Sequence, residues 1–261
     1  MIQARYALLL LALSYWDAWR LLVSRIGDGA AAFPLAVMLV GLAIAWSKLN
    51  KEKRLPMLWV IIALAAYIGA VFLGTAMVKI AVALVSIVAI VHRGLGGRNP
   101  PFAAMGVGIL ALPVLPSLDF YLAWPMRQLS ASLTASLLRL NGFSVQVEGV
   151  AIAWQDQLLL FDGPCSGINM LWASLLLTSI LSLLGRIGMW HYAAALTATS
   201  LLAIFANALR AASLFYLETG FLPTLEGPIF HEVVGIASFA MLGILLVFAF
   251  HKHNERMKVC A

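Results

Sequence analysis

The sequence predicts an all-α polytopic membrane protein with about eight transmembrane helices and a small extracytoplasmic cap. Three observations favour this fold class: a large apolar excess, its arrangement in long runs, and a one-sided distribution of lysine and arginine between the runs. Of the 261 residues, 63% are hydrophobic and 11% are charged. Soluble domains contain about 45–50% apolar and about 25% charged residues. Lipid is therefore the expected solvent.

Apolar runs recur along the whole chain. A helix needs about 20 mainly apolar residues to cross a hydrocarbon layer of roughly 30 Å. No repeat or soluble linker separates the runs, so residues 1–261 are interpreted as a single integral-membrane domain, with the first run retained because it lacks a cleavage pattern. The predicted spans are 5–23, 30–47, 56–73, 75–91, 101–117, 167–184, 191–216 and 230–250.

The charged residues between these runs predict the orientation, because lysine and arginine are retained on the cytoplasmic side of short loops. With the N-terminus inside, only Arg25, Arg127 and Arg139 are sorted to the outer segments. Both termini are then cytoplasmic, and the net charge of +6 is an orientation signal, so no nucleic-acid partner is expected. The cytoplasmic segments collect Arg5, Lys48, Lys51, Lys53, Arg54, Arg93, Arg98, Arg186, Lys252, Arg256 and Lys258.

The longest predicted extramembrane stretch, about 118–165, lies on the outer side and forms the cap. Leucines recur at helical spacing with polar residues between them, which predicts an amphipathic helix in the interface. Short β-prone runs separated by turn residues follow, which predicts a small sheet or β-hairpin. The leucines are Leu129, Leu133, Leu137 and Leu140, and the β-prone runs are 143–147, 150–154 and 158–161.

The cap leads directly into Cys165, at the predicted start of the sixth span. Free backbone N–H groups and the positive end of the helix dipole favour a thiolate at such a position, and the thiolate is the nucleophilic form. The chain has only two cysteines, so neither a disulfide framework nor a Cys-rich metal site is expected. Cys260 falls at the predicted cytoplasmic C-terminus and is assigned no site.

Arg210 and His231 fall at the outer ends of the next two spans. A charge in a transmembrane segment calls for compensation, and Asn207 shares a helical face with Arg210. A zinc helix would need a second ligand one turn after His231, where Gly235 stands, so a metal site is poorly supported and no cofactor is expected. Acyl transfer needs a nucleophile, a proton-transfer group and an oxyanion donor, and all three types are present.

Three short motifs now resemble the exosortase/archaeosortase family over roughly the last half of the chain. They are Cys-Ser-Gly at 165–167, Asn-x-x-Arg at 207–210 and His-x-x-x-Gly at 231–235. Each motif alone is unspecific, but their order, spacing and common predicted membrane face make the combination fairly specific.

The resemblance implies that the catalytic residues are Cys165, Arg210 and His231, with Asn207 and Ser166 as supporting candidates. It further implies a membrane-embedded cysteine transpeptidase or protease that cleaves a C-terminal sorting signal, made of a short motif, a transmembrane helix and a basic tail, through a Cys165 thioester. Substrate proteins and membrane lipid are the implied partners. Bacterial members act on signals of the Pro-Glu-Pro type (PEP-CTERM) and lie in the cell inner membrane, here with the site facing outside.

Two other classes remain open. A transporter or lipid-handling protein would use intramembrane charges such as Asp17, Arg20 and Lys79 to line a pathway. Against it, the spans show no inverted repeat, and Asp17 and Arg20 are spaced to satisfy each other. A structural assembly protein would leave the grouping of a thiol, a guanidinium and an imidazole unexplained.

Overall fold

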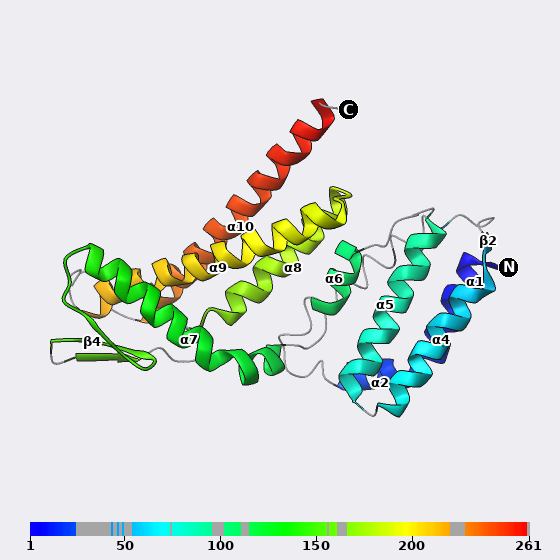
Figure 1. Ribbon diagram of the computed structural model, residues 1–261, viewed down its shortest axis with the longest axis horizontal. Coiled ribbons are helices and arrows are strands. Elements are labelled where there is room, and N and C mark those ends of the chain that lie inside the picture. The colour runs from blue at the N-terminus through cyan, green and yellow to red at the C-terminus, as the bar shows by residue number, and fades with distance from the viewer. Residues whose placement is uncertain are drawn as a thin grey trace. The chain divides into compact units, whose positions relative to one another are not determined.

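The structure is a computed structural model that describes residues 1–24, 43, 46, 49, 54–73, 75–95, 102–110, 115–155, 157–160, 166–219 and 228–259. These residues are mostly helical, and they cluster into two compact units, 1–114 and 115–261, each of which is described by itself (Figure 1). Three helices among the described residues are long and apolar enough to cross a membrane, or four if one bent pair forms a single span. The predicted span 30–47 lies almost wholly outside the described residues, so eight spans stay a prediction.

Unit 1 is built from helices that pack around an apolar core. The long helix α5, Ala76–Gly94, contacts α1, α2, α4 and α6. The core includes Leu11, Tyr15 and Ile80, which are almost fully buried. The other elements are α1 (Ala4–Ser14), α2 (Trp16–Ser24), α4 (Met57–Phe72), α6 (Phe102–Leu110) and the paired strands β1 (Ile2–Gln3) and β2 (Arg54–Leu55).

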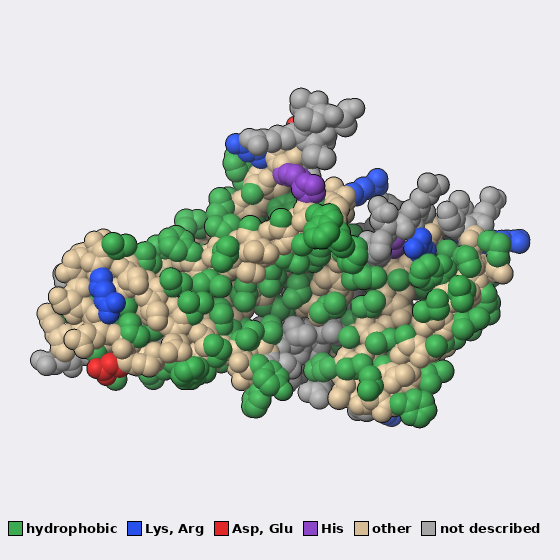
Figure 2. Space-filling view, viewed as in Figure 1, with side chains coloured by type: hydrophobic (Ala, Val, Ile, Leu, Met, Phe, Trp, Pro, Cys, Tyr) green, Lys and Arg blue, Asp and Glu red, His purple; other side chains and the backbone are tan. Residues whose placement is uncertain are grey.

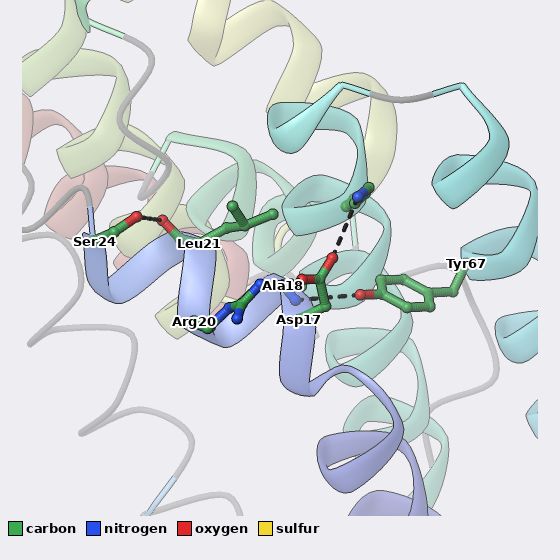
Figure 3. Close-up of polar contacts among 7 residues, drawn as sticks. Asp17, Ala18, Arg20, Leu21, Ser24 and Tyr67 are labelled. Carbon is green, nitrogen blue, oxygen red and sulfur yellow. Dashed lines mark hydrogen bonds and ion pairs between the residues drawn. The ribbon is translucent and has the colours of Figure 1, made fainter.

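The first predicted span is not one continuous helix. Helices α1 and α2 meet at Tyr15 and are bent by 60°. Tyr15 donates a hydrogen bond to the carbonyl of Ala63. The Tyr67 hydroxyl accepts one from the backbone N–H of Ala18 (Figure 3). Tyrosines from two helices therefore bind polar groups at the bend, which a hydropathy pattern cannot reveal.

Charged side chains lie at opposite ends of unit 1. At one end Asp17 is paired with Arg20 at 3.4 Å, as its spacing predicts, and also with Lys79 of α5 at 3.2 Å (Figure 3). At the other end Arg5 donates to the carbonyl of Leu49, and Arg93 stacks on a tryptophan. Between these ends the surface is dominated by hydrophobic side chains (Figure 2). Arg5 and Arg93, which the sequence assigns to the same side of the membrane, thus lie at the same end of unit 1, and the orientation itself stays a prediction.

Unit 2 contains four long helices, of which α9 (Met189–Glu218) contacts each of the others (Figure 1). They are α7 (Leu115–Leu140), α8 (Ile168–Leu184) and α10 (Pro228–Val259). Hydroxyl groups join α8 to α9: Thr178 bonds Thr199, and Ser179 bonds Tyr192, both at 2.8 Å. Such interhelical hydrogen bonds and small side chains hold helices together where lipid removes the hydrophobic driving force.

Helix α7 forms where the sequence predicts an amphipathic helix, and the structure adds which of its faces packs on other helices. Its buried residues are the small Ser130, Ala131, Thr134 and Ala135, together with Leu138. Of the leucine stripe, Leu129 is 40% and Leu140 is 84% exposed. The small face lets α7 approach α9 closely enough for Thr134 to donate to the Ala208 carbonyl at 3.3 Å.

α7 also begins earlier than the predicted cap helix. It starts at Leu115, whereas α6 ends at Leu110, so the end of the predicted fifth span, 101–117, belongs to α7 rather than to one helix with residues 102–110. Prolines stand at 113 and 116, and proline fits a first helical turn better than a helix interior, although α7 also contains Pro125 in its interior.

The segment after α7 forms a three-stranded antiparallel sheet, where a small sheet or hairpin is predicted. Its strands are β3 (Gln146–Glu148), β4 (Ala151–Trp154) and β5 (Gln157–Leu160), in that order. An aromatic cluster of Phe143, Trp154, Phe215 and Tyr216 packs this region on the C-terminal part of α9, with ring centroids 5.2–6.0 Å apart. The sheet is thus anchored to α9 shortly before the chain reaches Cys165.

Candidate functional site

Cys165 lies outside the described residues, and the description resumes at the residue after it. Ser166 is 2% exposed, and its hydroxyl accepts a hydrogen bond from the backbone N–H of Ile168 at 3.4 Å. Gly167 is the N-cap of α8 with a φ of 77°, and its carbonyl accepts the first hydrogen bond of the helix from Leu171. A left-handed φ favours glycine, so the third residue of the Cys-Ser-Gly motif sets the turn between the cysteine and α8.

Asn207 of α9 packs directly against this turn. A Cβ atom added to Gly167 would lie 2.7 Å from Asn207 Cγ and 2.8 Å from its Nδ2. The Asn207 side chain is 1% exposed, and its Nδ2 donates a hydrogen bond to the Ser130 hydroxyl of α7 at 3.0 Å. The carboxamide therefore joins three segments far apart in sequence: the turn after the cysteine, α9 and α7.

Arg210 follows Asn207 by three residues and meets the neighbouring helix. Its side chain is half-buried, and a Cβ atom added to Gly235 of α10 would lie 3.6 Å from both Nε and one terminal nitrogen of the guanidinium. That distance is an ordinary van der Waals contact. Glycine at 235 thus leaves room for the guanidinium against the α10 backbone.

His231 lies in the first turn of α10, which begins at Pro228, although its side chain is outside the described part of the structure. Positions 231 and 235 are one turn apart on the same helical face. The face of α10 that meets Arg210 is therefore the face that carries position 231.

α9 brings the three motifs of the sequence to one region of unit 2. Asn207 contacts the turn that follows Cys165, and Arg210 contacts α10 one turn from His231. Asn207 and Arg210 share a face because they are three residues apart. The described motif residues Gly167, Asn207, Arg210 and Gly235 thus meet pairwise where α9 contacts α8 and α10.

Sequence reasoning missed two features of this junction. Gly235 was interpreted as a missing zinc ligand and as the end of the His-x-x-x-Gly motif, without a contact assigned to it, whereas Arg210 lies against it. Ser130 was placed on the polar face of an interfacial helix, whereas it is buried against Asn207. The spacing of Ser130, Thr134 and Leu138, with alanines beside them, is typical of close helix packing in membranes and could have indicated this face.

A substitution series at Gly235 tests the contact with Arg210. Gly235→Ala should retain most activity because the added Cβ is at ordinary contact distance, whereas the γ-methyls of Gly235→Val should displace the guanidinium and lower activity at least about tenfold. Gly243→Val is the matched control, since Gly243 lies on α10 like Gly235 but faces Leu177 of α8 instead of Arg210. Equal losses in the two valine variants, measured at equal membrane expression, would contradict the contact.

Comparison with known proteins gives a single family. A family model described as "Transmembrane exosortase" matches residues 3–248, which run through both units. No curated protein and no solved structure matches the chain. Because the match extends over nearly all of the sequence and not only over the last half, the chain belongs to the transmembrane exosortase family.

Proposed function

We propose that this exosortase is a membrane-embedded cysteine transpeptidase or protease that cleaves the C-terminal sorting signal of exported surface proteins and passes them to an acceptor. The observation that carries the proposal is the role of α9, because Asn207 contacts the turn after Cys165 and Arg210 contacts the face of α10 that carries position 231. These contacts support a site in which a nucleophile, a cation and a proton-transfer group from distant parts of the sequence act together, as acyl transfer requires.

In the proposed reaction the Cys165 thiolate attacks the scissile carbonyl carbon and forms a C–S bond. The tetrahedral oxyanion is stabilised by the guanidinium of Arg210, which stays charged. Collapse of the intermediate breaks the C–N bond as His231 donates a proton to the leaving amine. His231 then takes a proton from the acceptor, which attacks the thioester and regenerates the thiolate. Asn207 and Ser166 hold the turn that carries the nucleophile.

We place this site on the extracytoplasmic side of the cell membrane, with both termini in the cytoplasm. The charge distribution of the sequence supports this orientation. The substrate signal would then enter as a transmembrane helix, with its motif at the outer interface and its basic tail inside. The sheet of residues 146–160, anchored on α9, would cover the site as the predicted cap.

Capture of the acyl-enzyme tests the proposal directly. A Cys260→Ser background leaves Cys165 as the single cysteine of the chain. When this variant is incubated with a reporter that carries a sorting signal from the same genome, hydroxylamine should release the reporter as a hydroxamate at the cleavage point. Cleavage without any hydroxylamine-sensitive intermediate, in an enzyme whose Cys165 is alkylated, would disprove the thioester.

The hydrogen bond between Ser130 and Asn207 provides a second prediction. Ser130→Ala removes the acceptor of the Asn207 amide, leaves that amide buried, and should lower stability by about 1 kcal/mol. We expect activity to fall about tenfold because the turn after Cys165 loses support. Ser132→Ala is the control, since Ser132 is exposed and bonds only the Gln128 carbonyl of its own helix. The measurements are melting curves in detergent and reporter processing. If the bond had no role, Ser130→Ala and Ser132→Ala would change the melting temperature and the processing rate equally.

The transporter alternative is less well supported by the contacts. The Asp17 carboxylate forms one ion pair with Arg20 and a second with Lys79. Charges that compensate each other in this way stabilise the packing of α2 on α5 and need no transported ion to explain them. Broken helices such as α1 and α2 do occur in transporters, but here the bend is satisfied by tyrosine hydroxyls.

A further inference from the structure

Unit 1 contains an apolar groove that the proposed reaction does not use. Helices α4, α5 and α6 line it, and its volume is about 370 Å³. Small side chains such as Ala66 and Ala89 form its walls, while Ile62 and Ile109 stand at its edges and are 50% and 46% exposed. The groove is therefore open at the surface and offers apolar contacts to an occupant.

One end of this groove carries a positive charge. Trp59 lines the groove, and the Arg93 guanidinium carbon lies 4.7 Å from the centroid of the Trp59 ring. This is the end of unit 1 that the charge distribution predicts to be cytoplasmic. Tryptophan is enriched at membrane interfaces, and basic pockets between helices on the cytoplasmic side bind anionic lipid headgroups. At the opposite end of unit 1, Arg20 and Lys79 share the carboxylate of Asp17, and neither is among the groove residues.

The geometry points to a binding site for one anionic phospholipid of the cytoplasmic leaflet, with an acyl chain in the groove and the phosphate on Arg93. An apolar chain suits walls that are almost entirely hydrocarbon, since the lining residues other than Trp59 and Ser86 are alanine, valine and isoleucine. A cation held on an indole at the interface attracts a phosphate, and a zwitterionic headgroup is attracted less. The charge distribution predicts the Arg93 end to be cytoplasmic and the proposed acyl transfer to be extracytoplasmic, so this lipid is a structural ligand and not the acceptor.

Lipid retention by the full-length protein tests the site. Native mass spectrometry in detergent would compare phosphatidylglycerol with phosphatidylethanolamine of identical acyl chains. The wild type should prefer phosphatidylglycerol, and Arg93→Gln should lower that preference at least about fivefold, with Arg93→Lys retaining part of it. Arg54→Gln is the matched control, because Arg54 is an exposed arginine at the same end that is not among the groove residues.

Groove-filling variants test the acyl-chain part independently. Ala66→Trp replaces an exposed alanine in the groove and should weaken binding of both lipids, whereas Ile61→Trp, exposed on the same helix but outside the groove, should not. Val85→Trp repeats the test from α5. Equal losses for Arg93→Gln and Arg54→Gln would show diffuse attraction and overturn the proposal. Normal lipid retention in both Ala66→Trp and Val85→Trp would also overturn the proposal. If reporter cleavage fell in those two variants at the same time, the groove would be assigned to a substrate helix.

Discussion

Replacing Cys165 with serine or alanine is expected to abolish cleavage of a sorting-signal reporter, by at least about 10³-fold, while a full-length enzyme still accumulates in the membrane. Removal of a covalent nucleophile leaves only the stabilisation that binding and the oxyanion donors supply. Serine is isosteric in outline, but its hydroxyl stays protonated where a cysteine near a helix N-terminus favours the thiolate. The measurement is the ratio of uncleaved to cleaved reporter at matched enzyme level.

The second cysteine of the chain provides the control. Cys260→Ser should leave cleavage within about twofold of the wild type, because the residue is separated from the α8–α9–α10 junction by the long helix α10. A membrane-impermeant alkylating reagent added from outside should inactivate the Cys260→Ser variant. Normal processing by Cys165→Ala would exclude the cysteine mechanism altogether.

Gly167→Ala is expected to have the second largest effect, lowering activity at least about 100-fold. The alanine Cβ would meet Asn207 Cγ at 2.7 Å, so either the turn or the buried carboxamide must move. The left-handed φ of 77° adds roughly 1–2 kcal/mol of strain for a residue with a Cβ. Since Gly167 is two residues after the nucleophile, a shift of about 1 Å there can cost about 100-fold in rate.

Gly142→Ala separates the contact from the strain. Gly142 has a φ of 88°, which is as unfavourable for alanine, but an added Cβ meets nothing within 4 Å. Both variants should lose a similar amount of thermal stability from backbone strain, and only Gly167→Ala should lose most of its activity. A Gly167→Ala enzyme that melts lower but cleaves normally would show that the Asn207 contact is structural alone.

The helices of this protein were largely predictable because each is defined by local composition. The ranges of α4, α5, α8 and α9 differ from the predicted spans by no more than a few residues at either end. α10 is longer than its predicted span and continues to Val259. The errors fall where tertiary contacts compensate polar groups. Tyr15 and Tyr67 stabilise the bend between α1 and α2, and the small face of α7, not its leucines, meets α9.

The junction around α9 was predictable in its members but not in its contacts. Asn207 and Arg210 were paired in the sequence by their helical spacing, and the structure gives each a different neighbour, Gly167 and Gly235. No periodicity indicates that residue 167 must be a glycine because the Asn207 side chain fills the space of the missing Cβ. Ser130 was missed for the same reason, since a buried serine looks like an interfacial one until its partner 77 residues away is known.

The sequence by itself determined that this is a helical membrane protein, because every helix that crosses the lipid must be apolar over its own length. It also determined the exosortase family, because the family's motifs are short and local. Only the tertiary structure decided which faces of those helices meet. In lipid, hydrophobicity does not distinguish a helix surface that faces the bilayer from one that faces another helix. Small residues, glycines and buried hydrogen bonds make that distinction, and at α9 they bring Asn207 to the turn after Cys165 and Arg210 to the helix that carries His231.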